Sequence, residues 1–158
     1  SYQGAGIEHN EAGSPTSTGA MHARMNEKRF HKLDVLRTRG DLFSIEDYAD
    51  ADLALISWCS TADLARAALA LARAEGLRVK LLVPWLLYPV AEETYLRFLE
   101  GVRTGLVVEQ SYQGQLFRIL RMFVDLPRGL GSFARSGANP FLPREVVARL
   151  REAAATVK

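Results

Sequence analysis

The chain has 158 residues, 48% of them apolar, which is enough for one domain of ordinary size with a hydrophobic core. Twenty basic and eighteen acidic side chains are spread along it with a net charge of +2, which argues against a nucleic-acid-binding protein. No apolar run reaches the roughly 18 residues of a membrane span, and the single cysteine excludes an internal disulfide, so we expect no membrane partner and a cytoplasmic location.

Residues 1–50 are rich in Gly, Ser, Thr, Glu and His and poor in aliphatic residues. We therefore expect a linker or the end of a preceding domain. Within this segment, residues 21–37 avoid Gly and Pro and contain good helix formers, which predicts one helix. The basic side chains of this helix either contact a phosphate or a partner, or simply face solvent.

From residue 51 onward the pattern changes to alternating strands and helices. Strands are predicted at 53–58, 78–83, 104–109 and 131–136, and helices at 61–75, 91–101, 115–124 and from residue 143. Successive short β–α units favour parallel strands joined by helical crossovers. Residues 51–158 are thus expected to form an α/β three-layer sandwich, a mainly parallel sheet of about five strands with helices on both faces.

Two of the predicted helices have clear boundary signals. Ser60 with Asp63 reads as a capping box at the start of the first, and Gly76 stands where a left-handed residue ends a helix. Pro143 occupies a favourable first helical position in the last. The expected buried stripes are Leu64, Ala67, Ala68 and Leu71 in the first helix, and Val146, Val147, Leu150 and Ala154 in the last.

Possible ligand sites lie where strands end and helices begin. Free amides at the helix starts near Ser60 and Gly114 could hold an anion at the carboxyl edge of the sheet. Glu109 ends a strand and precedes a turn, a position that favours binding residues, although one carboxylate defines no reaction. Neither G-x-G-x-x-G nor G-x-x-x-x-G-K-[ST] occurs, so a Rossmann dehydrogenase and a P-loop nucleoside triphosphatase are not supported.

Several reactive or aromatic residues allow two interpretations. Cys59, just before a helix, is either an activated thiol or a packing residue. His9, between two glutamates, suggests metal or acid–base chemistry, but a polar loop explains it better. Three aromatic side chains could form a partner-binding patch or belong to the core: Trp58, Trp85 and Tyr88.

Together, several segments resemble one family. The runs IEHNEAGSP (7–15) and EKRFHKL (27–33), with His22 between them, are similar to a Glu-His-Asn/Asp-Glu motif followed by a His and a Lys-Arg-x-x-Lys-Leu stretch. ADLALISWCST (51–61) resembles a strand and turn that usually end in Trp-Gly-Ser-Thr, so Cys59 stands where Gly is usual. VVEQSYQGQLFRILR (107–121) resembles Val-Val-Glu-x-Asn-x-x-Gly-Gln, with Ser111 in place of Asn, and SGANPFLPREVV (136–147) resembles a Gly-x-Pro-Phe-x-Pro-x-Glu ending.

These segments resemble the alpha subunit of 2-oxoacid:ferredoxin oxidoreductases, especially the 2-oxoglutarate type. The resemblance implies that residues 51–158 are a transketolase C-terminal-like domain in the C-terminal part of that subunit, with a role in assembly. It implies thiamine diphosphate, Mg, an iron–sulfur cluster and coenzyme A for the whole complex, but no catalytic, cofactor or metal residue in this fragment. The implied partners are the preceding alpha-subunit domain, the beta subunit, further copies of the chain in a homo-oligomer, and ferredoxin. Candidate ligand or interface residues are Ser60, Thr61, Glu109, Ser111, Gly114 and Gln115.

Two alternatives stay open. The chain could be a free-standing α/β module that binds a small anionic ligand at the helix starts near Ser60 and Gly114. It could also be the C-terminal domain of a transketolase-like or pyruvate-dehydrogenase-like subunit, although the motif over residues 8–33 argues against that.

Overall fold

The structure is a computed structural model that describes Gly4 and residues 6–156. The chain divides into two compact units, one ending at Thr38 and one beginning at Arg39. The first unit contains helix α1 (Gly19–Arg37), which occupies the segment predicted to be helical and has no buried residue. Within the described part of the chain, no helix is long and apolar enough to cross a membrane.

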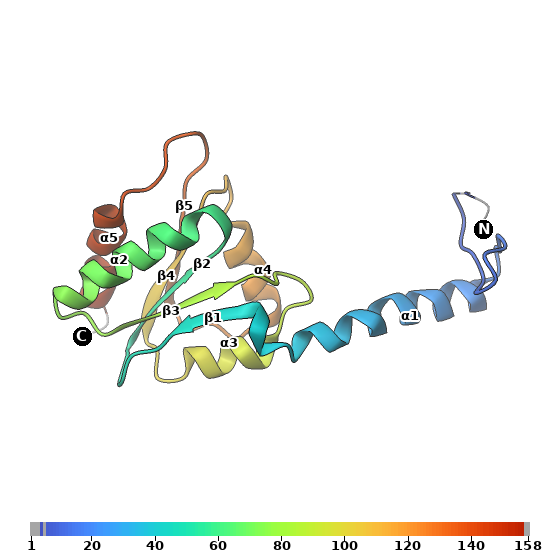
Figure 1. The fold of residues 1–158 in the computed structure, drawn as a ribbon, viewed down its shortest axis with the longest axis horizontal. Helices are drawn as coiled ribbons and strands as arrows, with labels where there is room; N and C mark the ends of the chain where they lie inside the picture. Colours follow the sequence, from blue (N-terminus) through green and yellow to red (C-terminus); the bar gives the residue numbers. More distant parts are fainter. Residues whose placement is uncertain (1–3, 5, 157–158) are drawn as a thin grey trace. The chain divides into compact units, whose positions relative to one another are not determined.

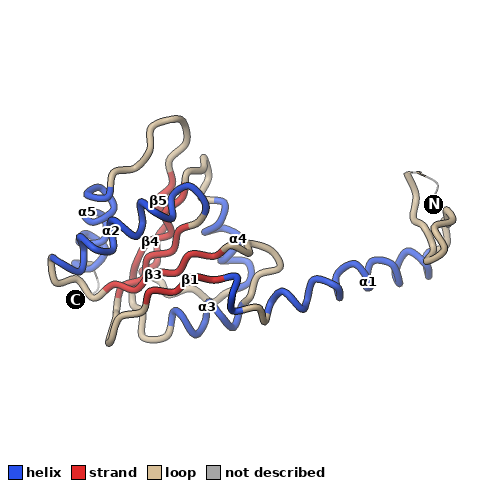
Figure 2. Tube along the Cα trace, in the orientation of Figure 1, coloured by secondary structure: helices blue, strands red, loops and turns tan. Residues whose placement is uncertain are grey.

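The second unit is built on one five-stranded sheet (Figures 1 and 2). Its strands lie in the order β1-β3-β2-β4-β5, and β1 is antiparallel to β3 while every other pair is parallel. The expectation of a mainly parallel sheet of about five strands is confirmed. The strands are β1 (Phe43–Glu46), β2 (Leu53–Ser57), β3 (Val79–Pro84), β4 (Thr104–Glu109) and β5 (Gly129–Ala134).

Helices cover both faces of the sheet, as the three-layer prediction requires (Figure 1). Successive residues of a strand point to opposite faces, so Leu53 and Leu55 join one core cluster and Ala54 and Ile56 the other. The first cluster is covered by α2 (Ala62–Ala74) and α5 (Pro143–Ala155). The second is covered by α3 (Glu92–Leu99) and α4 (Gln115–Phe123). Two short 3-10 helices, η1 (Gly40–Leu42) and η2 (Cys59–Thr61), precede β1 and α2.

The edges of the sheet differ from the sequence prediction. Strand β1 falls in the segment assigned to the linker, because its four residues, three half-buried and one exposed, give too short an alternation to be distinguished from a loop. Strand β5 begins at Gly129, two residues before the predicted start. A Cβ at Gly129 would lie 2.6 Å from the carbonyl oxygen of Arg103, so this close approach to the neighbouring chain segment requires a glycine that strand propensity would disfavour.

The predicted buried stripe of α2 was partly wrong: Ala68 is buried and Leu64 packs partly against the core, but Ala67 is exposed. Leu71 is exposed, and the buried positions are Ala62, Ala65, Ala68, Leu69 and Ala72. Alanines let the helix approach the sheet closely, so its buried face carries few large aliphatic side chains to mark it. Two boundary signals are confirmed, since Gly76 has φ +84° just after α2 and Pro143 begins α5. In α5 the predicted positions Val146, Val147 and Leu150 are buried.

Candidate functional site

The carboxyl ends of β2 and β4 bring the candidate residues to one edge of the sheet. The two strands are adjacent and parallel, with Ser57 opposite Val108, so the turns that follow them emerge side by side. Ser60 and Thr61 follow β2, and the remaining candidates end or follow β4: Glu109, Ser111, Gly114 and Gln115. Open parallel sheets bind ligands at this edge, which makes it the first place to search for a site.

Glu109 is fully buried, and its carboxylate caps α4. Its oxygens accept hydrogen bonds from the backbone amides of Leu116 (3.0 Å) and Phe117 (3.1 Å) and from the Ser111 hydroxyl (3.1 Å). A carboxylate at a helix N-terminus satisfies donors that lack an intrahelical partner and interacts favourably with the helix dipole. Glu109 is therefore a structural anion of the chain itself.

Ser111 satisfies the remaining amides of the same turn. Its hydroxyl oxygen accepts hydrogen bonds from the amides of Gly114 (3.0 Å) and Gln115 (3.3 Å). The four amides from Gly114 to Phe117 thus already have acceptors, and the expectation of free amides at this helix start was wrong. The physical reason is that the Glu109 carboxylate and the Ser111 hydroxyl occupy the amides that an external anion would need.

Gly114 is required by the geometry of this turn. It is the N-cap of α4 in the left-handed region, with φ +65°, where a side chain is strained. A Cβ built there would lie 2.4 Å from the Ser132 hydroxyl oxygen. The turn therefore packs against the Ser132 side chain of β5, and a larger residue at this position would be strained and would have to displace that hydroxyl.

The turn after β2 is held by buried hydroxyl groups. Ser57 Oγ lies 2.9 Å from the carbonyl oxygen of Val108 and 2.8 Å from Thr61 Oγ1, and Thr61 donates to the carbonyl oxygen of Trp58 at 2.8 Å. Ser57 and Thr61 are both buried. Thr61 therefore ties the start of α2 to the neighbouring strand, a structural role the sequence did not reveal.

The predicted capping box at Ser60 was wrong. Helix α2 begins at Ala62 with Thr61 as its N-cap, and no side chain caps it, because the 3-10 turn η2 occupies the place of the expected first turn. Ser60 is exposed in that turn, so anion binding there stays a prediction. Cys59 is exposed with φ +53°, a left-handed conformation that matches the glycine usual at this position of the motif.

An apolar pocket of about 430 Å³ opens beside the start of α4. It is lined by Trp58, Leu87, Gln115, Leu116, Arg118 and Ile119. Of the aromatic residues singled out in the sequence, Trp58 packs partly against the core, whereas Trp85 is 71% exposed. Tyr88 is also exposed and meets the Phe123 ring edge-on at 6.3 Å between centroids. Trp58 is thus half-buried against the core and Trp85 lies on the surface, and the partner-binding patch stays a prediction.

A second group of polar residues, in the first unit, clips a loop onto α1. Arg29 donates to Glu8 through both terminal nitrogens, at 3.0 and 2.6 Å, and His22 Nδ1 lies 3.6 Å from the same carboxylate. The hydrogen bond from Arg29 and that from the His9 amide lower the pKa of Glu8 to about 2. Sequence spacing could not predict this group, because Glu8 and Arg29 are 21 positions apart and meet only when the loop folds back.

Asn10 closes that loop. Its side-chain oxygen accepts hydrogen bonds from the amides of Ala12 and Ser14, both at 3.0 Å, and a β-bridge joins His9 to Pro15. This is the hydrogen bonding of an Asx turn, which fixes a polar loop without a core. His9 lies in a polar loop, as preferred in the sequence reading. Among the described residues, no group of three His, Cys, Asp or Glu could hold a metal.

Comparisons with known proteins bear on both units. No family model matches the chain. The chain is 30% identical over 149 residues to 2-oxoacid:ferredoxin oxidoreductase 2, subunit alpha, of Aeropyrum pernix, covering 92% of this chain and 23% of that protein. Among solved structures, 2-oxoglutarate:ferredoxin oxidoreductase from Magnetococcus marinus, with 2-oxoglutarate, coenzyme A and succinyl-CoA bound, matches with a TM-score of 0.86 and 31% identity, over 97% of this chain and 27% of that one.

The chain is related to the alpha subunits of 2-oxoacid:ferredoxin oxidoreductases. A second relative, ketoisovalerate oxidoreductase subunit VorB of Methanothermobacter marburgensis, is 27% identical over 128 residues, covering 81% of this chain and 35% of that protein. A split-gene transketolase, an inactive beta4 tetramer, matches with a TM-score of 0.56 and 14% identity over 73% of this chain and 42% of that one, which shows a transketolase-like fold. The resemblance seen in the sequence and the predicted fold are both confirmed. The chain spans only about a quarter to a third of the oxidoreductase subunits it matches.

Proposed function

We propose that this chain is the C-terminal part of the alpha subunit of a 2-oxoacid:ferredoxin oxidoreductase and that its role is assembly. The observation that carries the proposal is the match to the Magnetococcus marinus enzyme over nearly the whole chain but little more than a quarter of that one. A chain that matches about a quarter of the larger protein corresponds to only one part of that protein. The rest of the catalytic unit then lies in polypeptide outside these residues.

Helix α1 supports an assembly role. A 19-residue helix without a buried residue lacks the tertiary packing that stabilises most protein helices, and isolated helices of this length are marginal in water. Phe30 and Val35 are both more than 60% exposed on it. A partner surface, in this proposal the preceding alpha-subunit domain or the beta subunit, would bury them.

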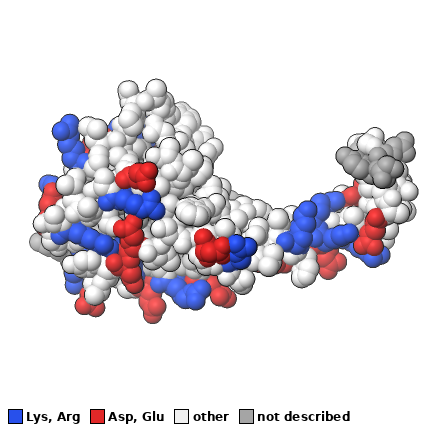
Figure 3. Space-filling model, in the orientation of Figure 1, with Lys and Arg blue, Asp and Glu red and all other residues white. Residues whose placement is uncertain are grey.

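The carboxyl edge of the second unit offers another surface of the same kind. Trp85, Tyr88 and Met122 are exposed on the second unit, and an apolar pocket opens at the start of α4. Aromatic residues and methionine are enriched at the centres of protein interfaces. By contrast, Figure 3 shows basic and acidic side chains interspersed on the face in view. The exposed apolar surface at this edge thus supports binding of a protein partner, which could be another copy of the chain in a homo-oligomer.

The proposed activity belongs to the whole complex, in the cytoplasm. It is the oxidative decarboxylation of a 2-oxoacid, which we propose to be 2-oxoglutarate, to its acyl-coenzyme A, with the electrons passed to ferredoxin. Thiamine diphosphate with Mg would be held elsewhere in the complex. The iron–sulfur cluster would also be held elsewhere, because one cysteine cannot supply the four thiolates that a cluster normally takes. Coenzyme A, bound in the Magnetococcus marinus structure, would reach an entrance that this chain helps to shape.

The free-standing anion-binding module is weakened as an alternative. It required open amides at two helix starts, and those at α4 are occupied by Glu109 and Ser111. Calorimetry with coenzyme A and phosphorylated metabolites distinguishes the two functions. Micromolar binding by the 158-residue chain alone would favour the free module, whereas the assembly proposal expects none.

Co-purification tests the assembly proposal. The 158-residue chain is mixed with a tagged preceding alpha-subunit part and the beta subunit, and a stable complex is expected. Trp85→Ser should weaken the complex at least about tenfold, because large aromatic anchors carry much of the binding energy of an interface. Leu71→Ser is the control, an exposed apolar residue near the C-terminal end of α2 and outside the carboxyl edge, and is expected to bind as the wild type does. Failure of the wild-type chain to join the complex would contradict the proposal.

A further inference from the structure

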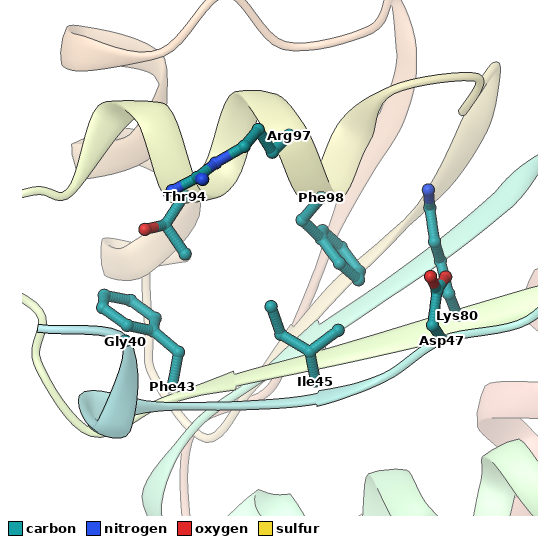
Figure 4. A pocket seen from close by; sticks show the side chains of 8 residues that line it. All are labelled: Gly40, Phe43, Ile45, Asp47, Lys80, Thr94, Arg97 and Phe98. Carbon is teal, nitrogen blue, oxygen red and sulfur yellow. The ribbon is translucent and has the colours of Figure 1, made fainter. Parts of the chain in front are cut away.

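A cavity of about 320 Å³ lies between α3 and the edge strand β1, away from every residue used above (Figure 4). Phe43 and Ile45 rise from β1 on one side, and Phe98 descends from α3 on the other. Thr94 and Arg97 of α3 close the side opposite the strand. The cavity therefore has an apolar floor and roof with polar groups at its margin, the usual composition of a small-molecule pocket.

Lys80 gives this cavity a buried positive charge. Its side chain is only 8% exposed, and it lines the cavity from β3. Its Nζ donates to the carbonyl oxygen of Glu100 at 2.9 Å and lies 5.5 Å from the centroid of the Phe98 ring. Among the described residues, no carboxylate lies within ion-pair distance of it, and an ammonium group has three donors. A largely buried ammonium that forms no direct ion pair is only partly compensated by the carboxylates around it, so an anion brought to Nζ would be stabilised.

Lys80 lines two neighbouring hollows, and the net charge of the residues around each indicates which of them suits an anion. The cavity lining carries two cations, Lys80 and Arg97, and one carboxylate, Asp47, a net charge of +1. A larger polar hollow of about 610 Å³ shares these three residues but adds one cation and three carboxylates, a net charge of −1: Arg78, Asp50, Asp52 and Glu100. The apolar cavity, not the larger hollow, is therefore complementary to a single negative charge.

We propose that this cavity binds a small amphipathic monoanion, a carboxylate on a short aliphatic chain. The aliphatic chain lies between Phe43, Ile45 and Phe98, and the carboxylate accepts a charge-assisted hydrogen bond from Lys80 Nζ. The volume is at the lower end of the range for ligand pockets, which suits a small ligand such as a short-chain carboxylate. A second negative charge would face Asp47 or the apolar wall, so dianions are disfavoured. The site belongs to this chain alone and does not depend on the proposed assembly role.

Calorimetric titration of the 158-residue chain with sodium hexanoate tests the proposal. Saturable binding with a Kd below about 1 mM is expected, which lies within the efficiency of good small ligands. Lys80→Met keeps the side-chain volume and removes the charge, and should weaken hexanoate binding about 10- to 100-fold, the range for a charged hydrogen bond. Arg78→Met is the matched control, because Arg78 lines only the polar hollow and pairs with Asp52, and its affinity should stay within about twofold of the wild type.

One further ligand and one methyl signal locate the binding site. In the wild type, 1-hexanol should bind at least about tenfold more weakly than hexanoate, and Lys80→Met should remove that preference. The Ile45 methyl resonances should shift on titration with hexanoate. No saturation up to about 10 mM hexanoate would show that the cavity is a packing void and would overturn the proposal. Unchanged hexanoate affinity in a folded Lys80→Met variant would overturn it as well.

Discussion

The buried carboxylate of Glu109 sets the geometry of the carboxyl edge. Two backbone amides and one hydroxyl converge on it, and the side chain has no exposed surface. Such a group resembles a ligand-binding acid when only the sequence is known, since it ends a strand and precedes a Gly-containing turn. Its contacts show that it stabilises the turn.

Replacing Glu109 by Gln tests this role. The amide nitrogen of Gln would face a backbone N–H donor or the Ser111 hydroxyl, and the charge–dipole attraction would be lost, so we expect the free energy of unfolding to fall by about 2–3 kcal/mol. Urea denaturation measures the change. Glu100→Gln, at an exposed side chain, serves as the control and should change stability by less than about 0.5 kcal/mol. Equal effects of the two variants would contradict the capping role.

Gly114 and Gly76 separate backbone strain from steric overlap. Both have positive φ, but a Cβ at Gly76 meets nothing within 4 Å, whereas one at Gly114 lies 2.4 Å from Ser132 Oγ. Gly76→Ala should cost about 1–2 kcal/mol from the left-handed conformation alone. Gly114→Ala should cost at least about 1 kcal/mol more, because the overlap adds to the strain. Adding Ser132→Ala should recover that excess, and no recovery would show that the overlap is not the cause.

Helices and strands were predicted correctly where their own residues carry a clear pattern, and were missed where contacts with other segments determine them. Strand β4 was predicted residue for residue, because its six residues are all buried and a glutamate and a turn follow it. Strand β1 was missed because its four residues gain their order from pairing with β3. The phase of α2 was misjudged because a face of alanines is recognised by its close approach to the sheet, which no pattern of large side chains records.

At the carboxyl edge of the sheet, too, the sequence predicted part of the arrangement and missed part of it. Parallel strand ends could be expected to gather Ser60, Glu109 and Gly114 at one edge, and the structure places them there. That Glu109 would occupy the amides of α4 depends on a bond between residues seven positions apart across a turn, and periodicity contains no such information. The cavity at Lys80 lies between elements distant in sequence, so nothing in the local pattern predicted it.

The loop clipped to α1 gives the first unit a pH dependence. The pKa of Glu8 is lowered from 4.5 to about 2, chiefly by the hydrogen bond from Arg29. A depressed folded-state pKa contributes stability that is present above pH 4.5 and is lost as the pH falls through about 2. Carbon-13 NMR titration of the Glu8 carboxyl should give a pKa near 2, and Arg29→Gln should move it back toward 4.5. A wild-type Glu8 that titrates near 4.5 would mean the clip does not form in solution.

At the scale of the whole molecule, the chain has a well-packed α/β core but leaves apolar surface open in both units. The core clusters on the two faces of the sheet are continuous and buried. Helix α1 of the first unit has no buried residue, and the second unit exposes Trp85 and Tyr88. This combination is expected for a domain that folds alone but completes its surfaces by assembly with other subunits.

The most direct measurement is ferredoxin reduction by a reconstituted complex. The preceding alpha-subunit part and the beta subunit are assayed with 2-oxoglutarate, coenzyme A and ferredoxin, with and without the 158-residue chain. We predict no turnover by the chain alone, little by the other parts without it, and coenzyme A-dependent turnover when all are combined. Turnover of the 2-oxoacid by the isolated chain, or full activity without it, would contradict an accessory layer whose chemistry is supplied by other polypeptide.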